Sequence, residues 1–130
     1  MTTENVFDWI KSLTTKADNY YCGILNSKKD KSFGIYPLKS SREREVVIGG
    51  ANGAKAKGIS ILIHWNTSTR ETETIALNLY ADLAAIDRPM IGDKQTNYIK
   101  LLHDEPIYVG TDDNGVCEYV IELVIYYERS

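Results

Sequence analysis

The sequence predicts an α+β domain with a mainly antiparallel sheet and two helices packed on one face of that sheet. Three observations indicate this class. Two segments repeat apolar residues at helical spacing, the strand-like segments do not alternate regularly with helices, and residues 107–128 have the pattern of a β-hairpin. Without regular βαβ alternation, a doubly wound parallel sheet is not expected. The length of 130 residues is that of one domain, which we expect to span residues 1–130.

A short amphipathic helix is expected near the N-terminus, where Thr2 or Thr3 can cap it. Four apolar residues recur there at helical spacing: Val6, Trp9, Ile10 and Leu13. Two strand-like segments follow, residues 20–25 and 33–38, and we expect them to form a strand pair. Pro37 cannot donate to a ladder, so the second strand lies at an edge or ends there.

A flexible, glycine-rich loop is expected at about residues 49–58, after a possible short strand at 46–48. The residues that define this loop are Gly49, Gly50, Asn52, Gly53, Lys55, Lys57 and Gly58. A phosphate-binding loop is the alternative. It is disfavoured because no lysine directly follows a glycine and no Ser or Thr follows the lysines.

The middle of the chain predicts a central strand followed by the main helix. Residues 59–66 alternate isoleucines and Trp65 with more polar side chains, as in a half-buried strand. Ser68, with Glu71 three residues later, is typical of a capping box, and apolar residues then keep helical spacing from Thr69 to Asp87. Pro89 ends this helix. Residues 90–97 are expected to be a polar connection and residues 98–103 an extended segment.

The hairpin at residues 107–128 is expected to turn at Asn114-Gly115, because both residues tolerate the positive φ of a type I′ turn. Alternation gives its second strand two faces. The predicted core face consists of Tyr108, Tyr119, Ile121, Leu123 and Ile125. The other face keeps an apolar strip of Ile107, Val109, Val120, Val124 and Tyr126. Either a second layer of the same chain or another subunit must cover this strip.

Composition and charge exclude several classes of function. The net charge of −3 and the pI near 5.4 disfavour general nucleic-acid binding. The apolar runs are too short to span a membrane, and the first residues lack the features of a signal peptide, so we expect a protein made and kept in a cytoplasm. Cys22 and Cys117 are expected to be structural thiols.

Candidate catalytic and metal-binding residues are few. His64 and His103 are interpreted as structural or surface residues, and Asp112 and Asp113 as turn residues. The sequence contains no HExxH, CxxC, GxSxG or GxGxxG pattern. We therefore expect no enzymatic activity, no catalytic residue, no cofactor and no metal.

The layout of the chain also resembles a known family. The residues that carry the likeness are Phe7-Asp8-Trp9-Ile10, residues 34–38, residues 59–63, the capped helix with Leu79 and Leu83, residues 106–110, Asp112 to Gly115, residues 119–121 and residues 126–129. Together they resemble the tail terminator proteins of long-tailed bacteriophages, also known as minor capsid proteins in phages and prophages of Gram-positive bacteria.

The resemblance implies an α+β subunit of the virion that forms a ring, expected to be a hexamer, at the junction of tail and head after assembly in the host cytoplasm. Its partners would be further copies of itself, the tail-tube protein and the head connector. Subunit contacts are then expected on Ile107, Val109, Val120, Val124 and Tyr126, and tube or lumen contacts on the loop with Gly49, Gly50, Asn52, Gly53, Lys55 and Lys57. A related connector or tube protein is one alternative. An enzymatic or small-molecule-binding domain that uses His64 and His103 is another.

Overall fold

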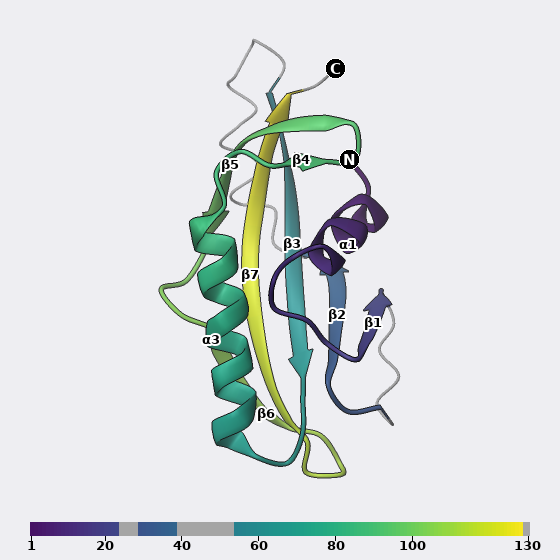
Figure 1. The fold of residues 1–130 in the computed structure, drawn as a ribbon, viewed down its shortest axis with the longest axis vertical. Coiled ribbons are helices and arrows are strands. Elements are labelled where there is room, and N and C mark those ends of the chain that lie inside the picture. The colour runs from purple at the N-terminus through teal and green to yellow at the C-terminus, as the bar shows by residue number, and fades with distance from the viewer. Residues whose placement is uncertain (24–28, 39–53, 129–130) are drawn as a thin grey trace.

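The computed structural model describes residues 1–23, 29–38 and 54–128. Its elements are α1 (Thr3–Lys11), β1 (Asn19–Cys22), β2 (Ser32–Pro37), β3 (Ala54–His64), α3 (Thr69–Ala85), β4 (Met90–Ile91), β5 (Lys94–Leu101), β6 (Ile107–Thr111) and β7 (Cys117–Glu128). They form one curved sheet with both helices on the same face (Figure 1). The predicted α+β class and the mainly antiparallel sheet are confirmed.

Strand β7 lies at the centre of the sheet, although it is the last element in the chain (Figure 1). The strand order is β1-β2-β3-β7-β5-β4. On one side, β3 pairs antiparallel with β7 from Ala54↔Glu128 to His64↔Glu118. On the other side, β6 pairs with the first part of β7 and β5 with the second part. Most of the sheet therefore depends on β7.

Strands β1 and β2 form the predicted pair, but they run parallel, a direction that the sequence did not indicate. Lys31 sets the geometry between them with a positive φ of 56°. Its N–H donates to Trp65 O at 2.7 Å, and its carbonyl accepts from Asp18 N at 2.9 Å and Asn19 N at 3.2 Å. These bonds place Asn19 beside Ser32, so both strands start at the same level. Strand β1 ends at Cys22, and residues 24 and 25 of the predicted segment lie outside the described residues.

Both helices begin at the predicted caps. Thr2 Oγ1 accepts from Asn5 N at 3.1 Å, and Ser68 Oγ accepts from Glu71 N at 3.2 Å. Helix α3 ends at Ala85, two residues before the predicted end, and the chain is extended at Ile86. Helix α1 packs on β1, β2 and β4, whereas α3 packs mainly on β7.

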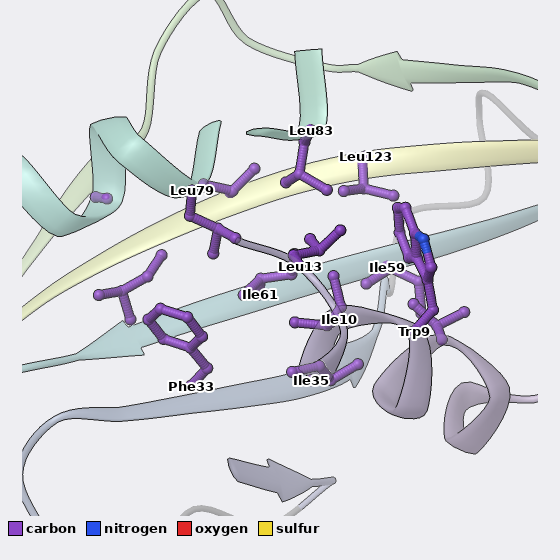
Figure 2. Close-up of a cluster of buried hydrophobic side chains, with 14 of the residues drawn as sticks. Trp9, Ile10, Leu13, Phe33, Ile35, Ile59, Ile61, Leu79, Leu83 and Leu123 are labelled. Atoms are coloured by element: carbon purple, nitrogen blue, oxygen red, sulfur yellow. The ribbon is translucent and has the colours of Figure 1, made fainter. Parts of the chain in front are cut away.

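The core lies between the two helices and the sheet. Figure 2 shows Trp9 and Ile10 of α1 and Leu79 and Leu83 of α3 gathered over the sheet. The sheet contributes Phe33, Ile35, Ile59, Ile61, Ile63, Tyr119, Ile121, Leu123 and Ile125. The side chains that alternation assigned to the core in β3, and those it assigned in β7 from Tyr119 to Ile125, are therefore correct.

Two predicted connections are wrong because they contain strands. Strand β3 begins at Ala54, so Lys55, Lys57 and Gly58 do not belong to a loop; they pair with Tyr127, Ile125 and Val124 of β7. Because β7 is long, its pairing with β3 continues to residues before Ile59, where the alternation of isoleucines begins. The remaining loop residues, Gly49, Gly50, Asn52 and Gly53, and the possible strand at 46–48 lie outside the described residues.

The predicted polar connection at residues 90–97 is a short hairpin of β4 and the start of β5. Gly92, with a positive φ of 62°, lies in the turn between them. The Thr96 side chain is fully buried. Polar composition misled the prediction here because a two-residue strand has no alternation to detect.

Candidate functional site

The turn between β6 and β7 is held by the side chain of Asp112. Its Oδ1 accepts from Asn114 N and Val116 N, each at 2.9 Å, and its carbonyl accepts from Gly115 N at 3.0 Å. Gly115 has a positive φ of 80°, but Asn114 does not lie in this region. The predicted type I′ turn is therefore wrong. Asp112 is a turn residue, as predicted. Hydrogen bonds to its carboxylate hold the turn in place, whereas the prediction relied on a positive φ at Asn114.

The predicted apolar strip is only partly exposed. Val109 is 51% exposed, whereas Ile107, Val120 and Tyr126 are half-buried. Val124 is fully buried at 0%, so it does not belong to an exposed strip. Contact of the other four residues with another subunit stays a prediction.

The prediction that Tyr108 lies in the core is wrong, because its side chain is 51% exposed. Its ring contacts that of Tyr119 at a centroid distance of 5.3 Å, so both side chains lie on the expected face. In the described part of the chain, however, β6 pairs only with β7 and is an edge strand. Alternation identifies the face of a residue and not the lateral position of its strand.

Most of the exposed large apolar side chains lie on the strands that flank β7 on the side away from β3. Four of the five large hydrophobic side chains that are exposed among the described residues lie on β4, β5 and β6: Met90, Tyr98, Tyr108 and Val109. We call this set the apolar margin. Tyr98 also stacks on Tyr126 with ring centroids 6.0 Å apart. The fifth, Leu77, lies on α3 and provides a natural control.

The two histidines occupy different environments. The side chain of His64 is completely buried, with Nδ1 2.8 Å from Glu118 Oε2 and Nε2 3.7 Å from Asp112 Oδ2. His103 is 46% exposed, and its Nε2 lies 3.1 Å from Glu122 Oε1. Each histidine therefore has its own carboxylate partners.

Two hollows of about 370 and 430 Å³ lie along α3. The smaller is lined by Lys31, Trp65, Arg70, Glu71, Thr74 and Ile75, and the larger by Thr14, Thr15, Lys16, Ile75, Asn78, Ala81 and Asp82. Neither is lined by His64 or His103, so neither supports a catalytic site built on them. Across residues 1–23, 29–38 and 54–128, no group of three His, Cys, Asp or Glu side chains is placed to hold a metal ion.

The two cysteines lie in different environments. Cys117 is buried, with its Sγ 3.4 Å from Thr69 Oγ1. Burial, followed by the negative charges of Glu4 and Asp8, raises the pKa of the Cys22 thiol. A raised pKa lowers the thiolate fraction and hence the reactivity.

None of the helices in the described segments is long and apolar enough to cross a bilayer. Comparison with curated proteins found no match. Comparison with family models found one, described as bacteriophage tail terminator protein, which matches residues 1–129. This match covers nearly all of the chain and agrees with the resemblance drawn from the sequence. The chain therefore belongs to the bacteriophage tail terminator family, whose members are structural components of the phage tail.

Proposed function

We propose that copies of this protein close into a ring on the last ring of the tail tube, stop its polymerisation and offer a surface to the head connector. Family membership supports a role in the tail. The apolar margin is the observation that supports assembly into a ring, since lateral strands of a sheet that expose apolar side chains are typical of surfaces that another subunit covers. The function is one of binding, without catalysis.

The subunit contact in this proposal includes Val109 and Tyr98 of the margin, with the half-buried Ile107, Val120 and Tyr126 beside them. Tyrosine suits this position because its ring buries apolar area while its hydroxyl remains hydrated before assembly. In a closed ring the margin of one copy meets a different surface of the next, because ring contacts are head-to-tail. A hexamer is the ring size expected from the resemblance.

The contact with the tail tube is proposed for the end of the sheet where β3 begins. Lys55 is exposed there and Lys57 is half-buried. The two side chains lie on the same face of β3, since they are two residues apart. Gly49, Gly50, Asn52 and Gly53 precede them in the chain and complete the proposed contact.

Light scattering coupled to size exclusion tests the ring with three single substitutions. Val109→Asp and Tyr98→Asp place a charge on the margin, and we expect both to give folded monomers where the unmodified protein gives a ring. Leu77→Asp is the matched control, because Leu77 is 46% exposed on α3 and lies outside the margin. A wild-type protein that stays monomeric, alone and with its tail-tube protein, contradicts the proposal.

Electron microscopy of tails assembled without the protein separates a terminator from a connector or a tube protein. Loss of a terminator leaves overlong tubes. Loss of a connector leaves tails of normal length that do not join heads, and loss of the tube protein leaves no tube. Only the first outcome agrees with the proposed function.

A further inference from the structure

His64 joins three parts of the fold at a position that solvent does not reach. It is the last residue of β3, it is paired with Glu118 of β7, and its ring lies beside Asp112 at the start of the β6–β7 turn. The His64 side chain is 0% exposed, and those of Asp112 and Glu118 are 15% and 20% exposed. We call these three residues the His64 latch.

Hydrogen bonding within the latch is incomplete if the imidazole is neutral. His64 Nε2 and Asp112 Oδ2 are the two buried side-chain atoms without a hydrogen-bond partner among the described residues, and they face each other at 3.7 Å. A neutral imidazole donates from one nitrogen only. If Nδ1 donates to Glu118, the lone pair of Nε2 faces a carboxylate oxygen. Two acceptors would then oppose each other in a buried place, which is unfavourable.

A second ring proton removes this conflict. With hydrogens on both nitrogens, Nδ1 donates to Glu118 and the positive charge also faces Asp112. Tyr36 of β2 is a further titratable group near this site. Burial and then the Glu118 charge raise the pKa of its phenol, so Tyr36 stays neutral and adds no charge to the latch. Among the described residues, no group of three His, Cys, Asp or Glu side chains is placed to hold a metal ion, and this includes the latch.

We propose that His64 is an imidazolium cation that ties the β6–β7 turn to the end of β3. The two carboxylate oxygens of Asp112 have different partners. Oδ1 accepts from the turn amides of Asn114 and Val116, while Oδ2 faces the cation. The latch thereby sets the position of β6, which immediately precedes Asp112 and carries Val109. His64 is a positioning residue, and this inference does not depend on the proposed ring.

Nitrogen NMR of the histidine rings at pH 7 tests the charge directly. The chain has two histidines, so a spectrum of His103→Gln leaves the His64 signals alone. We expect both His64 nitrogens to show the shifts of protonated ring nitrogens. A single protonated nitrogen, with the other shifted as a bare acceptor, overturns the proposal.

Amide hydrogen exchange tests whether the latch positions the β6–β7 turn, with a substitution that nearly keeps the shape of the Asp112 side chain. Asp112→Asn keeps an Oδ1 acceptor for the turn amides and replaces the charged Oδ2, which faces His64, by a neutral amide NH2. We expect the amides of residues 107–116 to exchange at least about tenfold faster, while those of α1 are unchanged. His64→Gln should have the same effect, and His103→Gln, which breaks an exposed pair, should have none. Unchanged exchange in Asp112→Asn shows that the charge does not position the turn.

Discussion

Val124 lies opposite Gly58 in the β3–β7 ladder, and both residues are buried on the sheet face away from the helices. Leu38 flanks Gly58 on the other side, with its N–H donating to Gly58 O at 3.0 Å. A Cβ atom on Gly58 would lie 3.0 Å from Leu38 Cβ. The missing side chain therefore leaves room for Leu38. The second face of the sheet has a small buried group of its own, which explains why Val124 is not part of an exposed strip.

Replacing Val124 by Asp is expected to unfold the protein, because the new carboxylate would be buried without a partner. The expected loss in the free energy of unfolding is at least about 3 kcal/mol. Urea denaturation followed by circular dichroism measures it. Val109→Asp is the comparison, with an expected change within about 0.5 kcal/mol because that side chain is 51% exposed. A Val124→Asp variant that stays a folded monomer would contradict this prediction and show that Val124 belongs to the exposed strip.

Replacing Gly58 by Ala is expected to destabilise the fold by about 1–3 kcal/mol, because the new methyl group overpacks against Leu38. The double variant Gly58→Ala with Leu38→Ala should show a favourable coupling between the two sites in a thermodynamic cycle. Gly34→Ala should cost less, although its Cβ would lie 2.8 Å from Tyr36 Cε2, since that atom belongs to the outer part of a half-buried ring. Equal costs at both glycines would contradict this interpretation.

Replacing Ser68 by Ala removes the N-cap of α3 and is expected to lower stability by about 1 kcal/mol. The reason is that Glu71 N loses the acceptor that it now has at 3.2 Å. Thr67→Ala, one residue earlier and exposed, serves as the control and should change little. The midpoints of chemical denaturation at constant slope provide the comparison.

Stability is expected to fall in alkaline solution. Burial raises the pKa of the Tyr119 and Tyr127 phenols above the ordinary value of 10.0. Above about pH 10 the unfolded chain therefore loses protons that the folded chain keeps, so the free energy of unfolding decreases as pH rises towards the folded pKa values. Denaturation at a series of pH values from about 8 to 11 measures this slope. Tyr127→Phe should make the slope shallower, and an identical slope would show that this phenol does not contribute.

Features that depend on neighbouring residues in the chain were predictable from the sequence. Ser68 and Pro89 bound α3 to within a few residues, because caps and proline act locally. Alternation assigned Ile121 and Leu123 to the core, because two-residue periodicity is a property of any strand. These features determine the fold class and the helix-covered face.

Features that depend on the position of a strand in the sheet were not predictable. Tyr108 and Tyr119 share a face, yet only Tyr119 is buried, because β6 is an edge strand and β7 is central. Lys55 was assigned to a loop because nothing near it in the sequence shows that β7 is long enough to pair with it. For the same reason the sequence did not place Asp112 beside His64, which lies 48 residues earlier in the numbering.

The central position of β7 also has a consequence for how the chain folds. Strand β7, which joins β3 to β5 and β6, leaves the ribosome after the other strands of this sheet, so a nascent chain that stops before Cys117 cannot form the assembled sheet. Pairings between residues far apart in the sequence, such as Ala54 with Glu128, slow folding because a long loop must close first. Refolding is thus expected on a timescale of about milliseconds to seconds, and the finished sheet can form only after synthesis has passed β7.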